Sequence, residues 1–223
     1  FVLRGGRVIA FLDAMSMVES RTNPMSQMQQ MAPGASSLDP LLEAWGLEFT
    51  TEKVVADLEY LTQVQGRGGE PQSMPTVLSL TNQAVSQDDP VTSELDSLLF
   101  AFPGAFEGKV VEGLNQETLV HTSDQVQLVE KFMAQMPGNS IMKDFEPENR
   151  QMALAMRITG TFKTAFPDGP PTDSEADAGG EAGEETADGG DGGGESAAEP
   201  SGLKESQGNG AVVLVGDADM LFG

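Results

Sequence analysis

Two aspartates, Asp217 and Asp219, directly follow the apolar run AVVLV at residues 211–215. Many metal-dependent phosphotransfer sites begin in this way, with the first Asp as nucleophile and the second as acid and base beside Mg²⁺. Such a site also needs a phosphate-binding hydroxyl, a Lys and further downstream carboxylates, whereas four residues follow Asp219. We therefore predict that GDADM is a strand-exit turn, in which one Asp accepts from the backbone amides that follow and Gly216 permits an unusual backbone angle.

A third carboxylate, Asp13, ends the apolar run VIAFL at residues 8–12. If the two runs form neighbouring strands, the three carboxylates converge, and their repulsion raises at least one carboxyl pKa unless a cation or a basic side chain lies between them. This convergence is the basis of an alternative function, a metal-dependent hydrolase that uses Asp13, Asp217 and Asp219.

His121 is the single histidine of the chain, so any histidine-dependent triad would have to use it. Thr122 and Gln125 have the spacing of a capping box, in which each side chain satisfies a backbone N–H of a helix's first turn. The apolar residues from Val126 to Met136 then form one stripe and predict an amphipathic helix over 124–136. We therefore expect His121, Thr122 and Ser123 to serve the start of this helix and not catalysis.

Two further segments contain residues that occur in binding loops, namely paired glycines in one and phenylalanines beside a lysine in the other. RGGR at residues 4–7 lacks the glycine spacing of a phosphate-binding loop and precedes its strand, so it predicts a tight turn. The segment TGTFKTAFPDGPP predicts a strand end and a β-turn. Its alternative is a loop in which Phe162 and Phe166 stack on a sugar or a peptide beside Lys163. The motifs call for no cofactor.

The composition excludes several classes of protein. The net charge of −23 argues against a nucleic-acid partner and against anionic membrane surfaces, because both require clustered Lys and Arg. The absence of cysteine excludes thiolate catalysis, disulfides and Cys-based zinc sites. No stretch approaches the roughly 20 apolar residues that span a bilayer. The chain begins at Phe1, and we expect it to be a fragment of a longer protein, with any membrane anchor outside it.

Strands interleaved with helices predict an α/β three-layer sandwich. The run at residues 8–12 indicates a central strand covered on both faces, and Asp39-Pro40 and Asp89-Pro90 each indicate a helix start. Further strands are expected around Val54 and Tyr60 and over residues 76–81, 98–102 and 152–159. Residues 173–202 contain ten acidic residues and no basic one. We therefore expect an α/β core over 1–171, a disordered acidic Gly-rich insertion over 172–209, and a final strand over 210–223 that returns to the same sheet.

Three segments, FVLRGGRVIAFLDAMS, LVHTSDQ and VVLVGDADMLFG, resemble in order the landmarks of the GldG-type auxiliary component of gliding-motility-like ABC transporters. This uncharacterised ABC-type transport system family has a glycine pair before a strand that ends in Asp-Pro, a Thr-Ser segment, and a Gly-Asp-x-Asp turn. The chain departs from the pattern at Ala14, where proline is usual, and in its acidic insertion. The family has no established catalytic constellation to transfer.

The resemblance implies a Rossmann-like sheet related to the class I glutamine amidotransferase fold, without that family's nucleophilic Cys. It implies a periplasmic domain, anchored by transmembrane helices outside this sequence, that acts with the permease and ATPase subunits of its system. We expect it to bind a partner, or a polysaccharide or peptide ligand, at the carboxyl edge of its sheet. The candidate binding residues are Asp13, Ser16, Thr122, Ser123, Asp217 and Asp219.

Overall fold

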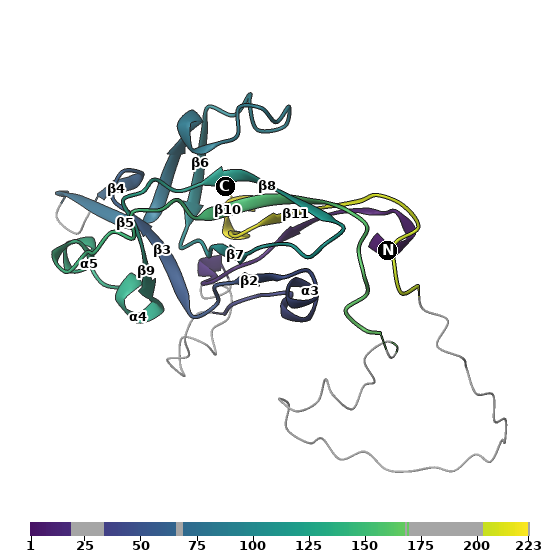
Figure 1. The fold of residues 1–223 in the computed structure, drawn as a ribbon. Helices are drawn as coiled ribbons and strands as arrows, with labels where there is room; N and C mark the ends of the chain where they lie inside the picture. Colours follow the sequence, from purple (N-terminus) through teal and green to yellow (C-terminus); the bar gives the residue numbers. More distant parts are fainter. Residues whose placement is uncertain (19–33, 66–68, 168, 170–202, 223) are drawn as a thin grey trace, which may run out of the picture.

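The computed structural model describes residues 1–18, 34–65, 69–167, 169 and 203–222. Its largest sheet has six strands, in the order β1-β11-β10-β7-β2, with β8 also paired to β10. β1 and β11 are parallel, and the other pairs are antiparallel. The strands are β1 (Arg7–Phe11), β2 (Leu47–Phe49), β7 (Phe106–Gly108), β8 (Leu114–His121), β10 (Ala153–Gly160) and β11 (Gly210–Val215). Figure 1 shows β1, β10 and β11 side by side, although β1 lies near the start of the chain and the other two lie in its last third.

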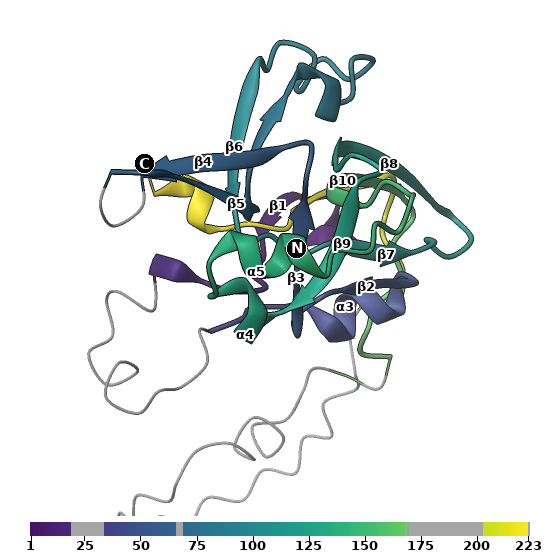
Figure 2. The ribbon, with the colours of Figure 1, turned by 90° about the vertical axis from the view of Figure 1, so that its left-hand side faces the viewer.

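Two smaller antiparallel sheets adjoin the large one. The first pairs β3 (Lys53–Asp57) with β9 (Val126–Glu130), and the second has the order β4 (Leu61–Gln65), β5 (Pro71–Thr81), β6 (Ser97–Ala101). The described α-helices are short: α3 (Asp39–Ala44), α4 (Lys131–Ala134) and α5 (Gly138–Lys143). There are also three 3₁₀ turns, η1 (Val2–Arg4), η2 (Asn82–Ala84) and η3 (Asp219–Leu221). Figure 2 shows α4 and α5 beside β3, β5 and β9.

The architecture is therefore mixed α/β, with a curled mixed sheet and few helices. The Rossmann-like three-layer sandwich and the relation to the amidotransferase fold are not confirmed. None of the helices in the described ranges is long and apolar enough to cross a membrane.

β11 is buried on both faces. Because side chains alternate along a strand, Val212 and Leu214 enter one apolar cluster while Val213 and Val215 face a second one. The first cluster includes Trp45, Met156 and Phe162, and the second includes Phe100 and Leu154. The apolar run AVVLV is thus a buried strand, as its sequence predicts.

β1, in contrast, lies at one end of the sheet order, and the Ile9 side chain is 65% exposed. The prediction of a central strand covered on both faces is wrong for this segment. A continuous apolar run is typical of burial, but it does not specify how many neighbours the strand finds.

Most other elements follow their sequence signals. The Asp39-Pro40 helix is α3, which begins after Leu38 and has Pro in its first turn. The expected strands around Val54 and Tyr60 are β3 and β4, and those over 76–81, 98–102 and 152–159 correspond to β5, β6 and β10.

The helices predicted over 124–136 and at Asp89-Pro90 are wrong. Residues 126–130 form β9, because five consecutive residues pair with β3, and only α4 is helical in the remainder. Pairing across the sheet outweighs the helical apolar stripe. Asp89 instead begins a set of turns, accepts the Val91 amide at 2.8 Å, and is buried against Arg157.

The acidic tract expected over 172–209 lies largely outside the described residues, and its last part, 203–209, leads into β11. That part is held by backbone bonds from Thr164 N to Lys204 O and from Ser206 N to Phe162 O, at 3.0 and 2.8 Å. The Ser206 hydroxyl also accepts from Phe162 N at 3.0 Å. The division of the chain into a core, an insertion and a returning strand remains a prediction.

Candidate functional site

The carboxyl ends of β1 and β11 lie together because the two strands are parallel neighbours, with Phe11 opposite Val215. This pairing brings Asp13, Asp217 and Asp219 into one cluster, and their exposed fractions are 5%, 0% and 8%. The Asp13 Oδ1 atom accepts the Ala218 amide at 3.1 Å, which links the end of β1 to the turn after β11. The convergence that the sequence made conditional on neighbouring strands is therefore present.

Asp217 joins this turn to a different sheet. Its Oδ2 atom accepts the Ala101 amide at the end of β6, at 2.6 Å, and its Oδ1 atom accepts the Met220 amide at 3.2 Å. Burial raises the pKa of Asp217 to about 7, and the negative charges of Asp13 and Asp219 add to the rise. Burial, followed by the charge of Asp219, also raises the pKa of Asp13.

Asp219 receives donors from the segment that follows β1. Its carboxylate accepts from the Met17 amide at 2.5 Å, from the Ser16 hydroxyl at 3.2 Å and from the Val18 amide at 3.3 Å. The four candidate residues that follow the first and last strands all lie in this one network: Asp13, Ser16, Asp217 and Asp219.

The turn after β11 matches its predicted role, since the chain bends at Gly216 and enters η3. The reason for the glycine is different from the predicted one. Gly216 does not adopt a left-handed angle, but a Cβ at this position would lie 2.5 Å from the Gly104 carbonyl oxygen. Close approach of two backbones, and not an unusual φ, therefore requires glycine here.

In this cluster the side-chain carboxylates accept hydrogen bonds from backbone amides. Within the described ranges, no three His, Asp or Glu side chains are placed so that they could hold a metal ion together. Each of the three carboxylates instead accepts at least one backbone amide. Buried carboxylates with amide donors tie loops together, and this arrangement supports the turn hypothesis over the hydrolase.

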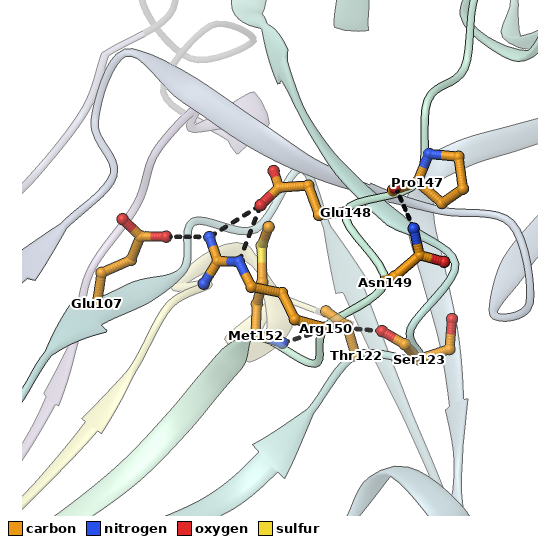
Figure 3. A network of polar contacts seen from close by, with 8 residues as sticks. All are labelled: Glu107, Thr122, Ser123, Pro147, Glu148, Asn149, Arg150 and Met152. Atoms are coloured by element: carbon orange, nitrogen blue, oxygen red, sulfur yellow. Dashed lines mark hydrogen bonds and ion pairs between the residues drawn. The ribbon is translucent and has the colours of Figure 1, made fainter.

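Thr122 and Ser123 lie outside this network, in the loop between β8 and β9. Thr122 Oγ1 accepts the Met152 amide at 2.9 Å and donates to the Ser123 carbonyl at 2.8 Å (Figure 3). The Ser123 hydroxyl and amide both donate to the Asp57 carboxylate, at 2.8 and 2.7 Å. The predicted helix cap is wrong, since β9 follows this loop. The same side chains instead join the loop to β3 and to the start of β10.

Asp57 was not identified from the sequence, yet it is the centre of this second network. Its carboxylate is fully buried and also accepts the amides of Glu59 and Tyr60, at 2.8 and 3.1 Å. It ends the run VVA just as Asp13 ends VIAFL, so the same sequence signal was available. His121 lies beside this loop, with its Nδ1 atom 2.8 Å from the Thr122 carbonyl oxygen.

A polar cleft of about 450 Å³ opens next to Ser123. It is lined by Glu59, Tyr60, Gln83, Ser123, Asp124, Asn149, Arg150 and Gln151.

Two backbone and charge features shape this cleft. Asn149 adopts a left-handed φ of 53°, which is uncommon for a residue with a side chain, and its side-chain Nδ2 donates to the Pro147 carbonyl at 2.9 Å. Arg150 pairs with Glu107 at 2.6 Å and Glu148 at 2.9 Å, as Figure 3 shows. The bond to Glu107 is the main cause of a raised Arg150 pKa. Two carboxylates of the protein itself thus balance the charge of the Arg150 guanidinium.

The loop with Phe162 and Phe166 lines a separate apolar cavity of about 250 Å³. Phe162 is fully buried, and its ring lies 5.0 Å from that of Trp45 in an edge-to-face arrangement. Phe166 is 38% exposed. Phe162 therefore belongs to the core and does not present a face for stacking, and the strand-end interpretation fits this segment better.

Comparison with known protein families gives a match over the whole chain. Over residues 1–223, the chain matches a family model for auxiliary ABC transporter proteins, described as an ABC-type uncharacterized transport system. Neither the curated proteins nor the solved structures contain a match. The resemblance of the three segments to an auxiliary component of an ABC-type system is thereby confirmed. The match includes the buried turn of aspartates, the Thr-Ser loop and the strands that carry them. The chain therefore belongs to the auxiliary family of ABC-type uncharacterized transport systems.

Proposed function

We propose that the chain is a non-enzymatic, ligand- or partner-binding module of a gliding-motility-like ABC transport system. The family match over the whole chain supports a place in such a system. As the resemblance implies, the module lies on the periplasmic face of the inner membrane, held by transmembrane segments outside this sequence, and works with the permease and ATPase subunits.

The observation that carries this proposal is the use of the reactive side chains. Asp13, Asp217 and Asp219 are buried and engaged with backbone amides, and Ser123 donates its hydroxyl to Asp57. An enzyme needs a nucleophile or base that is free to meet its substrate. These groups hold neighbouring segments together through hydrogen bonds. A binding module needs such a rigid framework around its binding surface.

The polar cleft beside Ser123 supplies recognition groups. Gln83, Asn149 and Gln151 each carry an amide with donors and an acceptor, and Tyr60 adds an aromatic ring. Such a lining suits a polar ligand that offers both donors and acceptors, which are the properties of a polysaccharide or a peptide. Thr122 and Asp57 hold the loop that forms one side of the cleft. The carboxyl edge around Asp13 and Ser16 is proposed as a partner surface.

A titration of the protein with a neutral oligosaccharide and, separately, with an uncharged peptide tests the ligand site. We expect amide NMR shifts around residues 123–124 and 149–151 that disappear in the double variant Gln83→Ala, Gln151→Ala. Gln65→Ala is the matched control, because Gln65 is exposed on β4 away from the cleft lining. Shifts that persist in the double variant would contradict the cleft as the site.

Calorimetric titration of Mg²⁺ and Mn²⁺ tests the absence of catalysis. The wild type and the double variant Asp217→Asn, Asp219→Asn should both bind these ions weakly. Tight binding that the double variant loses, together with phosphatase turnover, would instead establish the hydrolase.

A further inference from the structure

Three carboxylates connect the turn after β11 to neighbouring segments, beyond the backbone bonds that join Gly216 to Leu154 and Gly104 at the start of the turn. Asp217 connects it to β6 through the Ala101 amide, Asp13 connects it to β1 through the Ala218 amide, and Asp219 reaches the segment after β1. Each connection depends on a buried carboxylate, and the three are close enough to affect one another electrostatically. The strength of these side-chain connections in residues 217–222 therefore depends on how many of the three groups are charged.

The surroundings of Asp217 offer donors but no counter-charge in the described part of the chain. The charged groups that act on it are Asp13, from the end of β1, and Asp219, from η3. β6 contributes the Ala101 amide, and η3 contributes the Met220 amide. Beside it, Gly216 packs against the carbonyl oxygens of Gly104 and Leu154. A negative charge on Asp217 is thus repelled by two other carboxylates, and only hydrogen bonds from backbone amides stabilise it.

We propose that Asp217, together with Asp13 and Asp219, forms a protonation-dependent latch that holds residues 216–222 against β6 and β1 and loosens as the pH rises. The latch rests on the geometry of the cluster and does not depend on the proposed binding function. When it loosens, the turn that carries Leu221 and Phe222, which are already 59% and 67% exposed, gains freedom at the carboxyl edge.

The direction follows from the pKa of Asp217, which burial raises from an ordinary 3.8 to about 7. A carboxyl whose pKa is raised by folding binds its proton more tightly in the folded state. The latch is therefore fully tight only below the ordinary pKa of 3.8, weakens as the pH rises from there to about 7, and stays at its weakest above that.

Hydrogen exchange measured by NMR between about pH 5.5 and about pH 8.5 tests the latch, after correction for intrinsic exchange. The protection factors of the Ala101 and Met220 amides should fall about tenfold or more as the pH rises to about 7, and they should level off above it. The Glu59 and Tyr60 amides, which donate to the single buried carboxylate of Asp57, serve as the internal control and should keep their protection. Equal losses at both places, or no loss at Ala101, would overturn the proposal.

Two further measurements separate the latch from general loss of stability. In Asp217→Asn, the pH dependence of Ala101 protection should vanish, while Asp57→Asn should leave it unchanged. The carboxyl carbon of Asp217 in the wild type should titrate with a midpoint near neutrality, and this measurement does not depend on the folding of any variant. A midpoint near that of an ordinary aspartate would refute the latch.

Discussion

The carboxylate of Asp219 accepts a hydrogen bond from the backbone amide of Met17 at 2.5 Å, although the two residues are 202 positions apart. This bond closes the turn after the last strand onto the segment that leaves the first one. Together with the parallel pairing of β1 and β11, it makes the first and last described segments one structural unit.

Asp219→Ala should destabilise the protein, because the variant removes the acceptor of the Met17 amide at a site that is 8% exposed. A buried donor that loses its acceptor costs about 1–3 kcal/mol. The free energy of unfolding, measured by urea denaturation, should fall by this amount. Glu112→Ala, at an exposed position, is the control and should unfold at nearly the wild-type urea concentration. Identical midpoints for the two variants would show that the bond contributes nothing.

The stability of the wild type should depend on pH through Asp217. Between the ordinary pKa of 3.8 and the folded value of about 7, the folded state binds more protons than the unfolded state. The contribution of Asp217 to the free energy of unfolding therefore falls as the pH rises through this window and levels off above it, by on the order of a few kcal/mol.

The difference between wild type and Asp217→Asn isolates this contribution from that of the other carboxylates. The variant loses one acceptor for the amides of Ala101 and Met220, so it starts less stable at low pH. The gap should narrow as the pH approaches neutrality. Parallel pH profiles for the two proteins would contradict the raised pKa.

Thr122→Val should cost about 1–3 kcal/mol of stability, because the buried Met152 amide loses its acceptor while the volume of the side chain hardly changes. Thr118→Val on β8, the strand that leads into this loop, is the control, since Thr118 is exposed and valine suits a strand. Thermal unfolding of both variants shows whether the hydrogen bond from the Met152 amide to Thr122 stabilises the fold. An unchanged melting temperature for Thr122→Val would argue against this stabilisation.

Arg157→Gln should be far more destabilising than Arg150→Gln. Arg157 neutralises the fully buried side chain of Asp89 at 2.5 Å, and breaking such a pair costs about 3–5 kcal/mol because a buried charge loses its partner. Arg150 is half exposed in its pairs with Glu107 and Glu148, where ion pairs contribute about 0–1 kcal/mol. Denaturation midpoints of the two variants provide the comparison. A larger loss for Arg150→Gln would reverse this ranking.

Local patterns in the sequence identified several of the strands. The alternation over β10 and the continuous apolar run of β11 identify buried strands, because side-chain period and burial are encoded within a few residues. The Asp39-Pro40 helix start is likewise local. The family resemblance rests on the same local patterns, because the three segments that carry it are strands and the turns beside them.

The partners of each strand were decided by the tertiary structure. The apolar stripe over 124–136 has helical spacing, yet β3 provides a row of backbone donors and acceptors that draws residues 126–130 into a sheet. β1 and β11 could be named as strands, but their adjacency is a contact between opposite ends of the chain. Hydrogen bonds between strands are non-local, so no window of sequence contains them.

The candidate sites divide in the same way. The sequence identified Asp13, Asp217 and Asp219 by residue type and position after apolar runs, and it stated the condition for their convergence. It determined neither their burial nor their amide donors, on which the pKa of Asp217 depends. The cleft beside Ser123 combines residues from η2 and three loops, so it exists only when the sheets have packed. Residue chemistry is local, whereas desolvation and electrostatic neighbours arise from packing of distant segments, and these decided what each carboxylate does.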